Sequence, residues 1–410
     1  MSSPLLTPTL KETGQETQPN NSNMKRPWIP MAWLVALAFL PAIRAQLNIP
    51  SDGSDGVFAP SANVEIDLSE ATTDVWDADN SARAGRGIYD AEKWAVVFKF
   101  ASVTVPADVK VTFKNHPSRA PVVWLVQGDV VINGVVSVDG QAGDDNESLA
   151  HVNIEGGPGG FRGGLGVSGD GNSADSGLGP ANSYYSLSYG NPQILPLIGG
   201  PGHGPASQYS YPPKRRAGGG GAILIAARGS ITLGGKVTSN GGDFRQGASS
   251  PMFGGAIKLI CQEIAGGGTL EPGSGGRLRI EANSQKLTHP SLADYFAPPP
   301  GPTPVIWPPA DAPKARIVSV DGQPAPVDPP ARLNGQPDIM TQTTNQVEVV
   351  IETLNFPIEG SVQLRVIPKY ANAWWVGASR TEGDFTRALW VARTTVVQAY
   401  TTLQVRAAAP

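Results

Sequence analysis

The segment VVWLVQGDVVINGVVSVDG, residues 122–140, decides the fold class because it holds three short apolar strands separated by turns. Two later segments repeat this layout, AILIAARGSITLGGKVTS at 222–239 and AIKLICQEIAGGGTL at 256–270. The strands are rich in β-branched residues, which suit a pleated surface, and the turns fall at Gly or Asn, which tolerate positive φ. Repeated units of this kind predict the rungs of a parallel β-helix.

Two further segments extend the repeat in both directions. Residues 96–113 contain a similar set of three strands, and residues 277–282 alternate charged and apolar side chains, as expected of a rung whose outer face meets solvent. The rungs would start at 96, 122, 222, 256 and 277. We therefore expect an all-β chain with a parallel β-helix of about five rungs, stacked at ~4.8 Å into a core about 25 Å long.

One long insertion, residues 140–221, interrupts the succession of rungs. It contains 22 Gly in 82 residues. A loop of this length inside a compact domain is usually functional or disordered, and insertions into a solenoid tend to gather on one face. We therefore expect any local binding function to lie in this insertion.

The N-terminus predicts export. Residues 24–45 combine a cationic start, a short apolar run and a small-residue cleavage site, which is the layout of a signal peptide. The mature chain would begin at Gln46, and residues 1–23 would be a polar leader or the product of a start-site error. A signal anchor that stays in the membrane is the alternative, although the apolar run is shorter than the ~20 residues that a spanning helix needs.

The remaining sequence divides into four parts by composition. Residues 46–93 are expected to cap the β-helix of 94–296, since they precede its first strand edge. Residues 297–313 carry eight prolines and predict an extended linker. Residues 314–410 predict a small immunoglobulin-like β-sandwich. Its strand-like stretches are 316–320, 346–354, 361–367, 374–378, 388–395 and 401–405.

Charge and cysteine content exclude some classes of protein. The net charge is −4, and residues 1–45 carry four basic and two acidic side chains, so the mature part has a net charge of −6. An acidic chain has no electrostatic reason to bind nucleic acid. Cys261 is the only cysteine, so no internal disulfide can form, and its place in a rung predicts a buried, inert thiol.

Two groups of residues are candidates for binding. Trp374 and Trp375 are adjacent in a predicted strand, so one of them must face outward, where it could stack on a sugar ring. Asp74, Asp77 and Asp79 could supply oxygen ligands to a structural Ca²⁺, although a solvated acidic surface explains them as well. The same two readings apply to a wider set of acids, namely Asp52, Asp55, Asp67, Asp170 and Asp175.

The sequence does not favour catalysis. Three short elements loosely resemble motifs of polygalacturonases, namely Asp144-Asp145, Gly202-His203-Gly204 and Arg277-Leu278-Arg279-Ile280. The first two are too far apart for that family, and its Asn-Thr-Asp element is missing, so polar loop residues are the simpler reading.

Other chemical motifs are equally weak. The G-x-G-x-x-G match at 164–169 has no predicted helix after it. The histidines show no metal-ligand spacing. Lys214-Arg215-Arg216 is most simply a solvated basic patch. The histidines are His116, His151, His203 and His289.

The quoted rungs also carry a resemblance to a family. Residues 94–98 and 129–134, the Gly-Gly-Pro-Gly-Gly-Phe run at 156–161 and the Gly-Gly-Ala-Ile starts at 220 and 254 look like exported glycine-rich right-handed parallel β-helix proteins of Gram-negative bacteria. The resemblance covers about residues 50–285 and implies a pectin-lyase-like fold and export, without an established activity.

Two functions are compatible with these features. One is a non-catalytic structural or presentation protein, secreted or held at the cell surface, with cell-surface components as partners. The other is a protein that binds or degrades an extracellular polysaccharide along one face of the β-helix. Neither needs a cofactor, and no stable membrane span is expected after signal cleavage.

Overall fold

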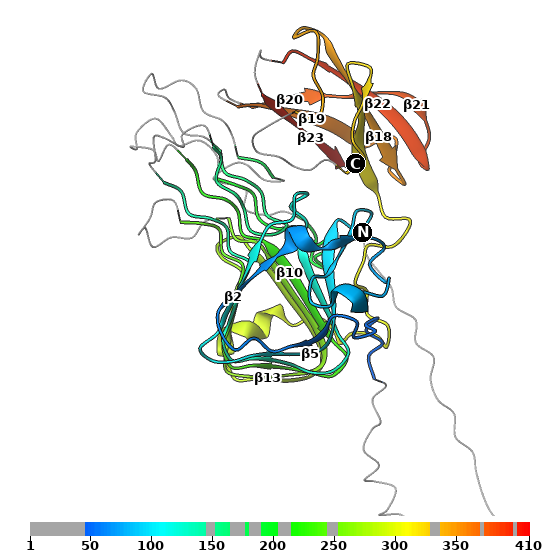
Figure 1. Cartoon of the computed structure of the whole chain (residues 1–410). Helices are drawn as coiled ribbons and strands as arrows, with labels where there is room; N and C mark the ends of the chain where they lie inside the picture. The colour runs from blue at the N-terminus through cyan, green and yellow to red at the C-terminus, as the bar shows by residue number, and fades with distance from the viewer. Residues whose placement is uncertain are drawn as a thin grey trace, which may run out of the picture. The chain divides into compact units, whose positions relative to one another are not determined.

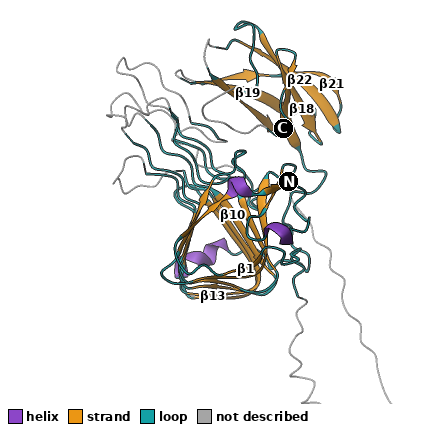
Figure 2. Ribbon diagram, in the orientation of Figure 1, coloured by secondary structure: helices purple, strands orange, loops and turns teal. Residues whose placement is uncertain are grey.

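The chain is all-β (Figures 1 and 2). The computed structural model describes residues 46–144, 152–164, 177–179, 190–203, 215–243, 253–328, 337–369, 373–396 and 400–410. Within these ranges the helical segments are short 3₁₀ turns, and none is long and apolar enough to cross a membrane. The predicted signal peptide and polar leader lie outside the described residues.

Five strands that the sequence repeat predicted stack in chain order as parallel neighbours. Their register aligns Val96, Val122, Ile223, Ile257 and Leu278. The pairing is parallel because each chain segment returns to the same side before the next strand begins. The strands are β5 (Ala95–Val105), β7 (Val122–Val126), β10 (Ala222–Ala227), β13 (Ala256–Gly266) and β15 (Arg277–Leu287).

Shorter strands complete each unit. β8 (Val130–Ile132) and β11 (Ser230–Leu233) pair with each other and with the C-terminal parts of β5 and β13. Since β5 and β13 each serve two neighbours, six strands form a closed cycle of parallel pairings, β5-β7-β10-β13-β11-β8. A second parallel sheet has the order β14-β12-β9-β6-β2. Its strands are β2 (Val64–Asp67), β6 (Lys110–Lys114), β9 (Val135–Ser137), β12 (Lys236–Thr238) and β14 (Thr269–Glu271).

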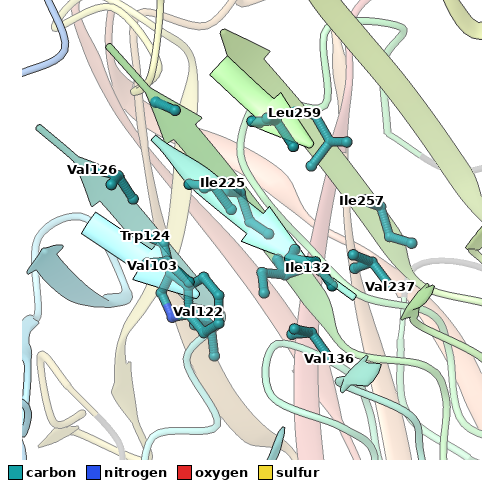
Figure 3. Packing of buried hydrophobic residues seen from close by; sticks show 14 of the residues in the cluster. Val103, Val122, Trp124, Val126, Ile132, Val136, Ile225, Val237, Ile257 and Leu259 are labelled. Carbon is teal, nitrogen blue, oxygen red and sulfur yellow. The ribbon is translucent and has the colours of Figure 1, made fainter. Parts of the chain in front are cut away.

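The space enclosed by these sheets is filled by apolar side chains (Figure 3). Alternate residues of each strand point inward, so the aligned positions of neighbouring strands form rows of packed side chains. Trp124, which is fully buried, is the largest of them, and its ring meets that of Phe100 edge-on at 5.7 Å. We call this set of strands and its core the strand stack.

The outer face of the β7-β10-β13 sheet is also buried, and the expectation that residues 277–282 form a solvent-facing rung is wrong in part, because Arg277 and Arg279 are partly exposed whereas Glu281 is buried. Two chain stretches, 192–198 and 302–307, lie against this face together with residues 47–49, and Glu281 is only 8% exposed. Burial on both faces explains why these strands read as continuous apolar runs. The apolar residues that cover the face are Leu47, Ile49, Ile194, Leu197 and Ile306.

Basic side chains on this face hold the covering segments by their carbonyl oxygens. Lys258 donates to the carbonyls of Gln193 at 3.1 Å and Val305 at 3.2 Å. Arg277 donates to the carbonyl of Ile198 at 2.5 Å. Burial holds the pKa of Lys258 below its usual value, although the nearby Glu281 carboxylate acts in the opposite direction. These cations therefore hold the covering segments in place, because hydrogen bonds that involve a charged group are stronger than those between neutral groups.

Residues 56–90 pair with the first strands of the stack. β1 (Gly56–Phe58) and β2 run parallel to β5 and β6, and β4 (Ile88–Asp90), which pairs with β3 (Thr72–Thr73), runs antiparallel to β5. Asp55 organises this region from a buried position, because its carboxylate accepts hydrogen bonds from Asn80, the backbone amides of Gly85 and Gly87, and the amide of Lys99. Asp55 is thus not part of a solvated acidic surface.

The C-terminal residues form two antiparallel sheets around their own apolar core. All six strands that the sequence predicted there are present, and two short ones are added. The first sheet contains β17 (Gln323–Pro324), β16 (Lys314–Val320), β18 (Val347–Leu354), β22 (Arg387–Thr394) and β21 (Ser379–Gly383). The second contains β20 (Trp374–Gly377), β19 (Ser361–Pro368) and β23 (Thr401–Ala408).

Candidate functional site: a glycine array

The described part of the insertion is an ordered array of chain segments that lie side by side (Figures 1 and 2). Apart from Thr238, the last residue of β12, these segments are neither strand nor helix, yet backbone hydrogen bonds join them throughout. We call them the glycine array. Its members are residues 138–144, 152–164, 177–179, 199–203, 215–221, 238–243 and 253–255.

The hydrogen bonds of segment 215–221 follow a period of three residues. The amides of Arg215, Gly218 and Gly221 donate to carbonyls in 138–144. The amides of the residues that directly follow these, such as Arg216 and Gly219, donate to carbonyls in 158–164. The amide of Gly220 donates to Phe253 in a third neighbour.

A strand could not bond in this way, because its polar groups point to only two sides. A period of three is that of the polyproline II helix, which makes no internal hydrogen bonds and leaves every amide free for a neighbour. The segment therefore has the bonding pattern of a polyproline II helix built largely of glycine, with neighbours on at least three sides.

Glycine is required here for space. A Cβ added to Gly219 would lie 2.0 Å from the carbonyl oxygen of Gly200, and one added to Gly163 would lie 1.9 Å from that of Arg216. The obstacles are backbone atoms of neighbouring segments, which no side-chain rotation can remove. The same reason requires glycine at the axis of the collagen triple helix. The abundance of Gly in 140–221 is thus the means by which backbones pack directly against one another.

Charged side chains are buried within the array, which overturns the prediction that Arg215 and Arg216 form a solvated patch. Arg215 is 8% exposed; it pairs with the Asp144 carboxylate at 3.1 Å and donates to the carbonyl of Val152 at 2.9 Å. Arg216 is fully buried. Lys214 lies outside the described residues. Buried guanidinium groups that hold carbonyl and carboxylate oxygens stabilise the array from inside.

Several points where the chain enters or leaves the array are hydrogen-bonded to one another. Asp144 and Arg215 exchange backbone hydrogen bonds at 3.1 Å in both directions. The amide of Gly164 donates to His203 at 3.0 Å, and the carbonyl of Gly164 accepts from Arg216 at 2.9 Å. On the neighbouring segment, the carbonyl of Asp243 accepts from Gly143 at 2.9 Å. These residues border the stretches 145–151, 165–176, 204–214 and 244–252, so the array brings together described residues that flank four chain stretches.

The elements that resemble polygalacturonase motifs are explained by structural contacts. Asp144 and His203 both belong to the array; the Asp144 carboxylate binds Arg215, and His203 meets the ring of Phe253 edge-on at 5.3 Å. Arg279 instead binds Glu281 and the carbonyl of Pro192. Asp145 and Gly204 lie outside the described residues, as does most of the G-x-G-x-x-G match.

The acids considered for Ca²⁺ are not brought together. Asp74, Asp77 and Asp79 are exposed, and the carboxylates of Asp74 and Asp79 accept hydrogen bonds from the residues that follow them in their turns. No group of three or more His, Cys, Asp or Glu side chains in the described ranges could hold a metal ion. Asp52 pairs with Lys99 and Asp67 with Lys114. Asp170 and Asp175 lie outside these ranges.

The two tryptophans point to opposite faces, as adjacent residues of β20 must. Trp374 faces the core and donates to Thr394 at 3.2 Å, whereas Trp375 is 38% exposed. The guanidinium of Arg406 lies 4.5 Å from the centre of the Trp375 ring, and that of Arg365 lies 5.9 Å from it. A sugar that stacked on Trp375 would compete with these cation–π contacts.

Cys261 is fully buried in the strand stack, as predicted, and burial raises the pKa of its thiol to about 12. A thiol in this state is a poor nucleophile, because the reactive form is the thiolate.

Sequence reasoning missed the array itself. The available signal was the spacing of glycines by three, as in Gly157, Gly160 and Gly163, but the run is too short and too often broken to stand out. No family model matches the chain, and neither a curated protein nor a solved structure is detectably similar to it.

Proposed function

We propose that this chain is an exported, non-catalytic presentation protein in which the glycine array is the functional element. In this proposal the strand stack is a right-handed parallel β-helix of about five rungs, of the glycine-rich pectin-lyase-like type. The C-terminal sheets are an immunoglobulin-like sandwich that serves as a spacer or attachment. The protein is secreted or held at the exterior of a Gram-negative cell, after cleavage of the signal peptide.

The observation that carries this proposal is the set of backbone hydrogen bonds that pair Asp144 with Arg215, Gly164 with His203 and Arg216, and Gly143 with Asp243. A backbone-packed array is a rigid base, since its segments have neighbours on several sides and few side-chain rotations. A rigid base that gathers the starts of several chain stretches suits recognition, because binding residues on a preorganised scaffold lose less entropy on binding.

The sequence of the gathered stretches supports recognition. Two of the chain's nine tyrosines fall within the gathered stretch 204–214, and three more fall within 180–189, which follows the array segment 177–179. Tyrosine supplies a large contact area with few rotatable bonds, and it is enriched in binding surfaces together with Ser, Gly and Asn. The expected partners are extracellular polysaccharides or other cell-surface components.

The experiment is a glycan array probed with the whole exported chain, run beside an assay for release of reducing sugar. A variant in which residues 204–214 are replaced by a Gly-Ser stretch of equal length should lose binding and keep the stability of the parent. The matched control replaces residues 329–336 in the same way and should bind normally.

Three results would contradict the proposal. Release of sugar would show an enzyme acting on a polysaccharide, which is the alternative function. Binding that survives the 204–214 exchange and is lost in the 329–336 exchange would place recognition in the C-terminal sheets. Cell fractionation that leaves the chain in the cytoplasm would refute export.

A further inference from the structure

A groove of about 610 Å³ follows the beginning of β15. One wall is the stretch 190–194, the other is formed by residues 294–297, and the floor is residues 275–279. This volume is within the range of sites that bind small ligands or short peptide segments. The groove uses none of the array residues on which the proposed function rests.

The floor of the groove is the edge of β15 that faces away from β13. The amide of Arg277 donates to Gly255 at 2.8 Å, towards β13, whereas the carbonyl of Ile280 accepts from Ala297 at 2.8 Å on the opposite side. Successive residues of a strand direct their polar groups to alternate sides, so the amide and carbonyl of Leu278 face the groove. Within the described residues, no backbone group bonds to Leu278 on that side.

A single described residue of the chain, Phe296, pairs with this edge of β15. Phe296 forms a parallel bridge with Ile280, as the first residue of a next strand would. The residues before it, Pro290–Tyr295, form a 3₁₀ turn instead, and Leu292 of that turn is buried in the core of the stack. The strand position beside residues 276–279 is therefore left without a strand among the described residues.

The side chains around this position favour acidic groups. Arg277 and Arg279 both line the groove, where they also bind the carbonyls of Ile198 and Pro192. The carboxylate on their strand, Glu281, is engaged by Arg279 at 2.5 Å and by Lys258 at 3.6 Å. Asp294 is the one acid among the lining residues. Tyr295, which is 42% exposed, supplies an aromatic wall.

We propose that this groove binds an extended peptide segment with alternating acidic and apolar side chains, which pairs with Leu278 as an additional strand of the stack. Main-chain hydrogen bonds give such strand addition its affinity, and alternate side chains give it specificity. The acidic side chains meet Arg277 and Arg279, and the apolar ones face Tyr295 and the end of the core.

The test measures fluorescence anisotropy of a labelled, end-blocked peptide of three Glu-Val repeats with the whole chain. We expect saturable binding. Two further peptides carry N-methyl groups, one on every Glu amide and one on every Val amide. Since only one edge of the peptide can face β15, one of these should lose affinity at least about tenfold and the other should bind as the parent does.

Variants locate the site. Tyr295→Ala and Arg279→Gln should each weaken binding at least about fivefold, since the first removes the aromatic wall and the second a charged donor. Lys286→Gln is the matched control, because Lys286 is an exposed cation on the same strand that does not line the groove. It should leave affinity unchanged, and circular dichroism should show the parent spectrum for all three.

Three outcomes would overturn the proposal. Absence of binding at millimolar peptide is one. Equal affinity of the two methylated peptides is another, because it would show that no strand edge is used. Displacement by an acidic sugar oligomer, combined with equal affinity of the methylated peptides, would show a site for anions in general. None of these results bears on the presentation function, which is tested by the 204–214 exchange.

Discussion

The strand stack and the glycine array both pack extended segments against one another, but the stack uses large apolar side chains and the array uses glycine. In both, extended segments lie side by side and are joined by backbone hydrogen bonds. A strand in the stack bonds to neighbours on two sides, and Val, Ile and Trp side chains fill the space between the sheets. A segment in the array bonds on at least three sides, and because glycine has no side chain, neighbouring backbones lie in direct contact.

The difference shows what each region depends on. The stack is stabilised by burial of apolar area, at roughly 25 cal/mol per Å². The array has glycine where the stack has large apolar side chains, so it depends more on satisfied amides and carbonyls, each of which contributes about 1 kcal/mol in net terms. Its buried arginines add charged hydrogen bonds, such as those of Arg215 to Asp144 and Val152. The stack should therefore fail when side-chain volume is lost, and the array when volume is gained.

Loss of volume in the stack has the largest expected effect. Trp124→Ala removes a fully buried ring that contacts Phe58, Phe100 and Phe113, and it should lower the free energy of unfolding by about 4 kcal/mol. Urea unfolding of the whole chain followed by circular dichroism measures this. Trp375→Ala, at a partly exposed site, is the control and should cost less than about 1 kcal/mol. A loss below about 2 kcal/mol for Trp124→Ala would mean that the core collapses around the cavity.

Gain of volume in the array comes next. Gly219→Ala places a Cβ 2.0 Å from a backbone oxygen of a neighbouring segment and should lower the free energy of unfolding by about 3 kcal/mol. Hydrogen exchange should show faster exchange of array amides and little change in the amides of β7 and β10. Gly301→Ala is the matched control, since a Cβ there meets no atom within 4 Å. Equal stability of the two variants would refute backbone-to-backbone packing.

How far the sequence predicted the two regions follows from this difference. The stack was foreseen because Val122, Ile223 and Ile257 recur at matching places in similar segments, and apolar periodicity is the signal that burial leaves in a sequence. Their parallel pairing confirms that part. The array was not foreseen, because a packed backbone leaves only glycine, and glycine occurs equally in turns and in disordered chains.

The burial of side chains by segments that are not strands could not be predicted from the sequence either. The alternation in residues 277–282 correctly placed Leu278 and Ile280 inward, but it could not show that residues 192–198 bind the outward Arg277 and Arg279 through their carbonyl oxygens. The same limit applies to Arg215 and Arg216. A run of basic residues predicts solvent unless the buried oxygen atoms that receive their hydrogen bonds are known, and those lie far away in sequence.

A smaller change tests how polar the interior of the stack can be. Cys261→Ser replaces a weakly polar thiol with a hydroxyl in an apolar core and should lower the free energy of unfolding by about 1–2 kcal/mol. In the parent chain, a thiol reagent at pH 8 should modify Cys261 only as fast as the stack opens, because the thiol is fully buried and its pKa is about 12. Immediate modification of the native protein would show that the stack is open at β13.

The smallest expected effect is electrostatic and lies at the edge of the stack. The Asp52 carboxylate binds the buried Lys99 ammonium at 2.7 Å. Burial tends to raise the pKa of Asp52, but the hydrogen bonds from Lys99 and Ser54 together outweigh it and hold the pKa below the usual 3.8. A lowered carboxyl pKa stabilises the fold above the unfolded value, and this stabilisation disappears as the pH falls through the folded value.

Asp52→Asn should therefore cost less than about 1 kcal/mol at pH 7, because the carboxylate is 45% exposed and screened by solvent. The difference between parent and variant should shrink below pH 4, where the parent loses the same charge. Urea titrations at pH 7, 5 and 3 measure the trend, with Asp79→Asn as an exposed control that has no cationic partner in its turn. A difference that stays near zero from pH 7 to pH 3 would show that the carbonyl oxygens of Asp77 and Ala78 hold Lys99 without a contribution from Asp52.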